Sequence, residues 1–196
     1  MLKKLLALVF IASMFLTNLN ANEKGKVTGG SYHEWPSWFK ESFLNIGEDI
    51  EEAKEEDKHV ILFLSLDFCP YCTKMLDDNF KEGAKNQEYI QNNFDVIGIN
   101  IKGSRELALN EEQSMTEKEY ADFLKVMYTP TIIFLNQDNE QVVRVNGYRS
   151  EPNFKLILDY VKNKEYKNME LTTYLEKVKN KTFYTLKDNS MYKDIS

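Results

Sequence analysis

The sequence feature that most constrains the fold is a nearly unbroken apolar run from Val60 to Leu66, with the sequence VILFLSL. The run is short, rich in residues that favour strands, and shows no alternation of apolar and polar positions. Such a pattern is typical of a strand that is covered on both faces. It therefore predicts a buried strand at the centre of the fold.

The segments around this strand predict alternating helices and strands. Before it, an amphipathic helix is indicated by the helical spacing of Phe39, Phe43, Ile46 and Ile50. Further helices are expected over 70–80, over 87–94, around Tyr120, Phe123, Leu124 and Met127, and from a Ser150 cap through Val161. Strands are expected over 96–101, 131–135 and 142–145, the last two forming a hairpin, and the polar residues 102–116 are expected to be a surface insertion. This order predicts an α/β fold with a central mixed β-sheet flanked by helices.

The N-terminus has the anatomy of a secretory signal peptide. Lys3 and Lys4 precede an apolar run from Leu5 to Leu16, and a polar stretch follows to Ala21. The run of about 12 residues is shorter than the roughly 20 needed to cross a bilayer, so a cleaved leader is favoured over a retained anchor. We therefore expect an exported protein that is periplasmic and soluble once the leader is removed.

The rest of the chain has the length of one ordinary domain. We expect residues 1–21 to be the signal peptide, 22–164 to form the domain, and 165–196 to form a C-terminal tail with a short helix. A hydrophobic content of 42% is sufficient for a packed core. The net charge of −6 argues against a nucleic-acid partner, because phosphate binding requires a basic surface. The sequence does not indicate an oligomeric state.

The chain has only two cysteines, Cys69 and Cys72, directly after the predicted central strand. With Cys69 at the N-cap of the next helix, Pro70 takes the first helical position, where its missing N–H costs nothing. A Cys69 thiolate then lies near free backbone N–H groups and the positive end of the helix dipole, which lower the pKa of a thiol. Cys72 lies almost one turn along, so Cys69 can form a mixed disulfide that Cys72 resolves. This chemistry needs no metal and no organic cofactor.

Two other interpretations of the cysteine pair stay open. A static disulfide that closes so short a loop stabilises a protein by only about 2 kcal/mol, which a core of this size scarcely needs. Half of a zinc site would need two further ligands, and the only histidines are His33 and His59. The placement between strand and helix in a cysteine-poor exported chain favours redox chemistry over both.

A second motif, Thr129-Pro130-Thr131 at the start of a later predicted strand, combines with Cys69-Pro70-Tyr71-Cys72 into a family pattern. Over about residues 34–164 the chain resembles the thioredoxin superfamily, and its expected helix over 35–58, the strand VIGINI and Gly147-Tyr148 make it most similar to exported SoxW-like thioredoxin-related proteins. The resemblance implies a thioredoxin fold with a cis Pro130 beside Cys69. It also implies that the Thr129 backbone, with Pro70 and Tyr71, binds an extended substrate.

The sequence departs from the thioredoxin pattern at two places. Typical thioredoxins carry an acid six residues before the first cysteine, and Phe63 stands at that position here. Water or another group must therefore accept the proton of the resolving thiol. The intervening Pro70-Tyr71 resembles glutaredoxins, so the redox potential and the direction of electron flow are not implied. Asp67 is interpreted most simply as a solvated loop acid, or else as a charge that weakens the thiolate.

The resulting hypothesis is an exported thiol:disulfide oxidoreductase that reduces protein disulfides and receives electrons from a membrane partner. One alternative is a dithiol oxidant or isomerase acting on the same protein thiols. Another is a binding module that uses the fold without turnover.

Overall fold

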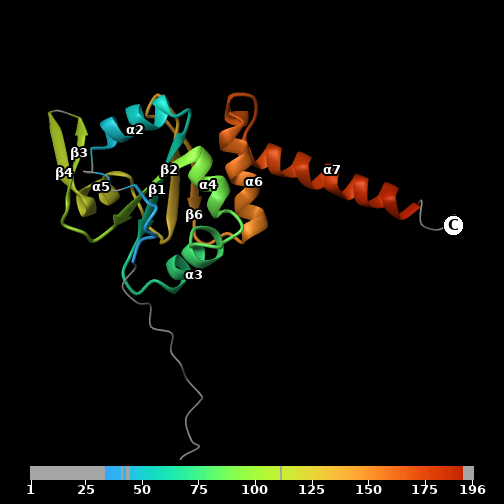
Figure 1. The fold of residues 1–196 in the computed structure, drawn as a ribbon, viewed down its shortest axis with the longest axis horizontal. Coiled ribbons are helices and arrows are strands. Elements are labelled where there is room, and N and C mark those ends of the chain that lie inside the picture. The colour runs from blue at the N-terminus through green and yellow to red at the C-terminus, as the bar shows by residue number, and fades with distance from the viewer. Residues whose placement is uncertain (1–33, 41, 43–44, 111, 192–196) are drawn as a thin grey trace, which may run out of the picture.

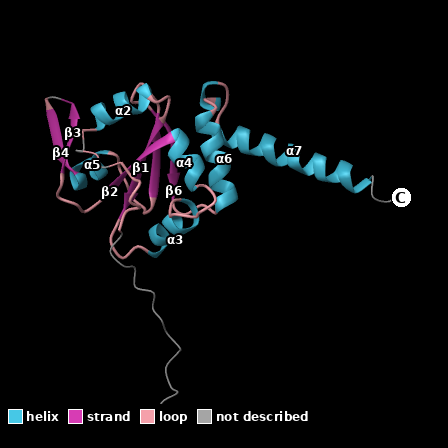
Figure 2. Cartoon of the chain, viewed as in Figure 1, coloured by secondary structure: helices cyan, strands magenta, loops and turns pink. Residues whose placement is uncertain are grey.

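The structure is a computed structural model that describes residues 34–40, 42, 45–110 and 112–191, with only the backbone described over 182–191. The predicted signal peptide, residues 1–21, lies outside the described residues. A four-stranded sheet in the order β2-β1-β5-β6 forms the centre, and helices cover both of its faces (Figure 1, Figure 2). The predicted α/β architecture is confirmed.

The predicted central strand is β1 (His59–Ser65), and all seven of its residues are buried. It runs parallel to β2 (Phe94–Asn100) and antiparallel to β5 (Thr131–Leu135). The predicted hairpin joins β5 to β6 (Gln141–Asn146). Because β1 has a partner strand on each side and helices above and below, its apolar run needs no alternation.

The two faces of β1 belong to two separate hydrophobic cores. Ile61 and Phe63 lie in the core formed with α3 (Pro70–Asn79), α4 (Gln87–Asn93) and α6 (Glu151–Lys162). Val60, Leu62 and Leu64 lie in the core formed with α2 (Ile46–Glu55) and α5 (Glu117–Phe123). The site-bearing helix α3 is therefore supported by the aromatic core on one face of the sheet.

The continuous helix expected over 35–58 is wrong, because the described helix begins only at Ile46. Trp35 and Phe39 pack in the core on the α3 face, whereas Ile46 and Ile50 pack in the core on the opposite face. The chain thus passes around the β2 edge, where the Lys40 N–H donates to the Val96 carbonyl at 2.9 Å. A single straight helix cannot pack against both faces of the sheet, and α2 begins after its N-cap residue, Asn45. Phe43, the fourth residue of the predicted pattern, lies outside the described residues.

The insertion after β2 has a structure that the sequence did not indicate. It forms the hairpin β3 (Glu106–Asn110) and β4 (Gln113–Thr116), with Leu107 fully buried. The following helix α5 ends at Phe123, and Lys125 adopts a positive φ of 53°. The helix predicted through Met127 therefore ends earlier than expected, and both Phe123 and Met127 are exposed.

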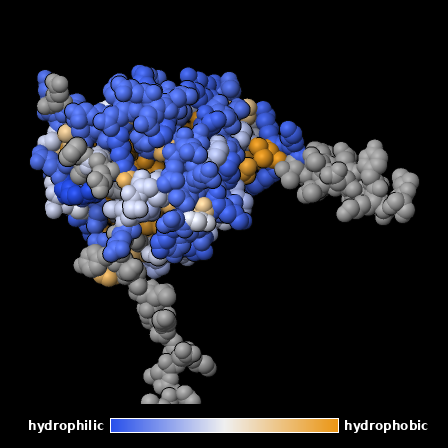
Figure 3. All heavy atoms as spheres, viewed as in Figure 1, coloured by the Kyte–Doolittle hydropathy of each residue, from blue (hydrophilic) through white to orange (hydrophobic). Residues whose placement is uncertain are grey.

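The C-terminal segment contains a short 3-10 helix, η1 (Glu165–Lys167), and a helix of 21 residues, α7 (Leu171–Met191). The helix is longer than the short one predicted, and it extends away from the body (Figure 1). Leu171 and Tyr174 in its first turn pack against the core. Figure 3 shows a mostly hydrophilic face, with a hydrophobic patch where α7 leaves the body. Among the helices that the structure describes, none is long and apolar enough to cross a membrane.

Candidate redox site

Cys69 and Cys72 form a disulfide at the N-terminus of α3, with their Cα atoms 5.3 Å apart. Cys69 is the N-cap residue, and its Sγ accepts a hydrogen bond from the Cys72 N–H at 3.2 Å. Pro70 occupies the first turn, where its missing N–H removes no helical bond. The arrangement is the one that the spacing predicts, and it aims a backbone donor at the Cys69 sulfur.

The two cysteines differ in their access to solvent. Cys69 is 9% exposed, whereas Cys72 is completely buried. Thiol–disulfide exchange requires a direct approach to sulfur, and Cys69 is the more accessible residue of the pair. This asymmetry fits the predicted roles, attack by Cys69 and resolution by Cys72, which stay predictions.

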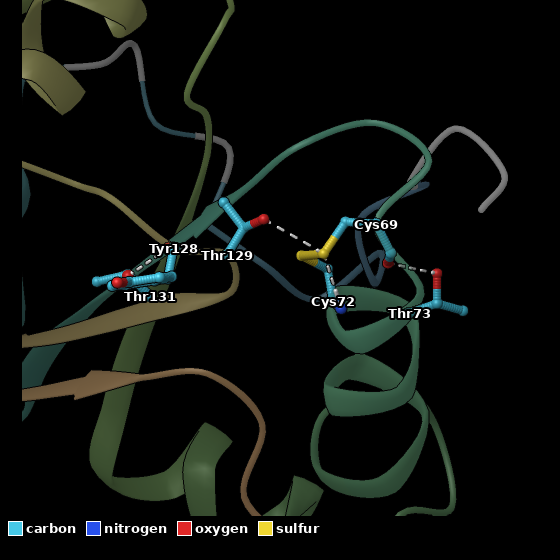
Figure 4. The surroundings of a disulfide bond; sticks show 6 residues. All are labelled: Cys69, Cys72, Thr73, Tyr128, Thr129 and Thr131. Carbon is cyan, nitrogen blue, oxygen red and sulfur yellow. Dashed lines mark hydrogen bonds between the residues drawn. A yellow bond between two sulfur atoms is a disulfide. The ribbon is translucent and has the colours of Figure 1, made fainter. Parts of the chain in front are cut away.

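Thr129 and Pro130 lie on the other side of the disulfide, although 60 residues separate Thr129 from Cys69 in the sequence. The Thr129–Pro130 peptide bond is cis, which is the geometry that the family resemblance implies. The Thr129 hydroxyl points at the disulfide and donates to Cys69 Sγ at 3.4 Å (Figure 4). The structure therefore brings the two sequence motifs together, while the substrate-binding roles of Thr129 and Pro130 stay predictions.

Exposed apolar side chains flank both motifs in the sequence. The described residues include five exposed large hydrophobic side chains: Phe68, Tyr71, Phe123, Met127 and Tyr128. Four of the five lie within three positions of Cys69 or Pro130 in the sequence. We call these four residues, Phe68, Tyr71, Met127 and Tyr128, the apolar rim. Tyr71 was predicted to contact a partner, whereas the other three were missed, although their proximity to the two motifs in the sequence could have indicated them.

Phe63 stands six residues before Cys69, at the position where typical thioredoxins have an acid. Its side chain is fully buried and makes an edge contact with Phe80 at 5.2 Å between ring centroids. Trp35 also makes an edge contact with the Phe63 ring, at 5.8 Å between ring centroids. This aromatic environment offers no group at position 63 that could take the proton of Cys72.

The loop between β1 and α3 is fixed by a hydrogen bond to the neighbouring strand. The Asn100 amide, at the end of β2, donates to the Asp67 carboxylate at 3.0 Å. Asp67 lies in a loop and is partly exposed, as its simplest interpretation expects, but its carboxylate is also held by this hydrogen bond. Phe68, between Asp67 and Cys69, has a positive φ of 61°. Bulky residues rarely adopt this left-handed conformation.

The zinc interpretation gains no support from His59. This residue begins β1, so it lies at the opposite end of the strand from the cysteine pair. Its Nε2 is 3.3 Å from the Tyr166 hydroxyl, and burial lowers the pKa of His59 to about 4. His33 lies outside the described residues, and the described part of the chain contains no cluster of three residues suited to hold a metal ion.

A mixed sheet between helices, with a CXXC disulfide at a helix N-terminus facing a cis-proline loop, defines a thioredoxin-like protein. The family model described as a thioredoxin-like domain matches residues 46–162, which is more than half of the chain. The chain therefore belongs to the thioredoxin-like family. No curated protein matches the chain.

Several solved structures are similar to this chain at low sequence identity. A thioredoxin-fold protein from Helicobacter pylori is 21% identical, with a TM-score of 0.56, and the match covers 72% of this chain and 99% of that one. A thioredoxin from Thermus thermophilus is 20% identical, with a TM-score of 0.46 and coverage of 68% and 87%. A DsbH oxidoreductase is 15% identical, with a TM-score of 0.45 and coverage of 72% and 92%. The first of these similarities supports the fold.

Proposed function

We propose that this chain is an exported thiol:disulfide oxidoreductase of the SoxW-like kind, which reduces protein disulfides through Cys69 and Cys72. The observation that carries the proposal is the asymmetry of the pair, because the more exposed cysteine is also the one whose sulfur accepts two hydrogen bonds. The apolar rim supports a polypeptide substrate, since exposed apolar surface favours contact with a protein partner. The leader pattern of residues 1–21 supports export.

The cycle consists of two exchanges. The Cys69 thiolate attacks one sulfur of a substrate disulfide, a Cys69–substrate disulfide forms, and the other substrate sulfur leaves as a thiolate that takes up a proton. The Cys72 thiol then gives its proton to water and attacks Cys69 Sγ. The bond between Cys69 and Cys72 forms, and the second substrate sulfur leaves and is protonated. The substrate gains two electrons and two protons, and a dithiol reductant, in our proposal a membrane protein, restores the pair.

The proposal is tested first by insulin reduction with the chain lacking residues 1–21. We expect the wild-type protein to accelerate reduction and Cys69→Ala to be inactive. In Cys72→Ala the attacking thiol is kept and the resolving thiol is lost, so mixed disulfides with Cys69 should accumulate on non-reducing gels. Folded Cys72→Ala protein that forms no reductant-sensitive adducts would contradict turnover through this motif.

The reactivity of Cys69 is tested by iodoacetamide alkylation of the reduced protein as a function of pH. The donors at Cys69 Sγ favour the charged form, so we expect the pKa of Cys69 to lie below the free-thiol value of about 8.5. Labelling that starts at Cys72, or a Cys69 pKa at or above that value, would overturn the assignment. The midpoint potential, measured in the same samples, separates a reductant from an oxidant or isomerase. A protein that binds partners without exchange would be a binding module.

A further inference from the structure

Phe68, the residue before Cys69, has an unfavourable backbone conformation that other parts of the structure must stabilise. Phe68 has a φ of 61°, and an aromatic residue in this left-handed region persists only where its surroundings hold it. The turn at Phe68 directs the chain from the end of β1 into the start of α3, where Cys69 takes an extended N-cap conformation. The position of Cys69 Sγ relative to its two donors therefore depends on Phe68.

The neighbouring residue Asp67 is a point where the rest of the fold holds this turn. Its carboxylate accepts from the Asn100 amide at 3.0 Å, across 33 residues of sequence. Asn100 is itself fixed, because its backbone N–H donates to the Glu117 carboxylate at 3.0 Å. Glu117 is almost completely buried and pairs with Arg105 at 2.6 Å. A rigid support thus extends from the start of α5, through the end of β2, to the loop before the disulfide.

We propose that Asn100 is a positioning residue for the redox site: its hydrogen bond to Asp67 holds Phe68 in the left-handed conformation that places Cys69 Sγ between its donors. The proposal rests on the dithiol chemistry proposed above and adds a residue that touches neither cysteine. Without the bond, Phe68 relaxes to an ordinary conformation and Cys69 Sγ moves relative to the Cys72 N–H and the Thr129 hydroxyl. The Cys69 thiolate then loses stabilisation, so the pKa of Cys69 rises and the disulfide becomes harder to reduce.

The first test compares Asn100→Ala with Asn93→Ala. Asn93 is a matched control, because it is half-buried like Asn100, directly precedes β2, and donates its amide to the Tyr89 carbonyl. For Asn100→Ala we expect about fivefold slower alkylation of Cys69 at pH 7. We also expect about a fivefold shift toward the disulfide in equilibrium with dithiothreitol, which corresponds to about 20 mV at 29.6 mV per tenfold change. Asn93→Ala should match the wild type, and equal behaviour of the two variants would overturn the proposal.

A second pair of variants separates the hydrogen bond from the charge of Asp67. Asp67→Asn and Asp67→Ala both remove the negative charge, but only the asparagine has a side-chain oxygen that can accept from Asn100. We expect Cys69 in Asp67→Ala to react about fivefold more slowly than in Asp67→Asn. Equal rates in the two proteins would contradict the role of the bond. If Asn100→Ala does not fold, this pair of variants alone tests whether the hydrogen bond between Asp67 and Asn100 affects Cys69.

A third comparison tests whether the effect passes through Phe68. Glycine adopts positive φ about as readily as negative φ, so Phe68→Gly weakens the need for external support. In the Phe68→Gly background, Asn100→Ala should shift the dithiothreitol equilibrium by about twofold or less. A shift as large as in the Phe68 background would overturn the mechanism. The dithiothreitol equilibria need no protein substrate, so the expected shifts can be observed even if the protein does not reduce insulin. Conversely, the protein can reduce insulin even if the Asn100 substitution does not shift these equilibria.

Discussion

Cys69 Sγ receives hydrogen bonds from two donors that differ in kind. The Cys72 N–H belongs to the first turn of α3 and is fixed by the helix, whereas the Thr129 hydroxyl is a side-chain group that substitution can remove. Hydrogen bonds to a charged group are stronger than those between neutral groups. The hydroxyl of Thr129 therefore offers a way to change the acidity of Cys69 while the helix stays intact.

Replacing Thr129 by the nearly isosteric valine should raise the pKa of Cys69 and slow its alkylation at pH 7 about threefold, because a charge-assisted hydrogen bond is lost. Thr73→Val is the matched control, since the Thr73 hydroxyl donates to the Cys69 carbonyl at 3.4 Å and not to the sulfur. Alkylation rates over pH 5–10 give both pKa values. A Thr129→Val protein with the wild-type profile would show that the hydroxyl does not stabilise the thiolate.

At the residue scale, the sequence predicts local backbone geometry better than it predicts contacts between residues that are far apart in the chain. The positions of Cys69, Pro70 and Cys72 follow from helix capping, which depends only on neighbours along the chain. The left-handed Phe68 could not be predicted, because local preference opposes it. Its support comes from Asn100, which the sequence places 33 residues from Asp67. Only the pairing of β1 with β2 brings these residues together.

At the scale of elements, the clearest difference from expectation is the segment before α2. The apolar spacing of residues 39–50 is helical, yet its residues belong to cores on opposite faces of the sheet. Periodicity reports which residues are buried, but not against which face they are buried. The passage around the β2 edge is set by tertiary contacts, among them the close approach of Trp35 to Gly98.

Replacing Gly98 by alanine should destabilise the fold by about 1–3 kcal/mol, because a Cβ forced into a packed site displaces its neighbours. An ideal Cβ at this position would lie only 2.5–2.9 Å from three atoms of the Trp35 ring. Gly47→Ala is the control, since its Cβ would meet ordinary contacts at 3.4 and 3.5 Å. Alanine favours a helix over glycine, so this control should leave stability unchanged or raise it by up to about 1 kcal/mol. Urea denaturation measures both, and an equal effect of the two substitutions would contradict the packing of Trp35 on β2.

At the scale of the whole molecule, His59 and Tyr166 join the central strand to the C-terminal segment. His59 is almost completely buried at the start of β1, and Tyr166 belongs to η1. Tyr160 of α6 adds a second link, because its hydroxyl donates to the Met169 carbonyl at 2.6 Å. The sequence indicated a C-terminal tail with a short helix, but not the full length of α7. The predicted domain boundaries stay predictions.

The buried His59 should make the stability of the protein depend on pH. Burial, followed by the charge of Lys164, lowers the pKa of His59 from 6.5 to about 4 in the folded state. Between these two values the unfolded chain binds more protons than the folded one, so stability falls as the pH drops from about 6.5 toward 4, by at most about 1.4 kcal/mol per pH unit. Above pH 6.5 the contribution of His59 is constant.

The measurement is chemical denaturation at several values of pH between 7 and 4.5. His59→Gln keeps a polar side chain beside Tyr166 but cannot titrate, so the difference in unfolding free energy between wild type and variant should shrink or reverse as the pH falls. Because carboxylates titrate equally in both proteins, this difference isolates the histidine. Parallel curves for the two proteins would contradict a neutral, buried His59.

The chain has two tryptophans, and both lie in the short segment that passes around the β2 edge. The Trp38 indole N–H donates to the Phe80 carbonyl at the C-terminal end of α3, and Trp35 stacks on Phe39. Intrinsic fluorescence is therefore a local optical probe of how this segment sits against the helix that carries the disulfide. A red shift that precedes the loss of circular dichroism would reveal that the segment separates first, before the sheet unfolds.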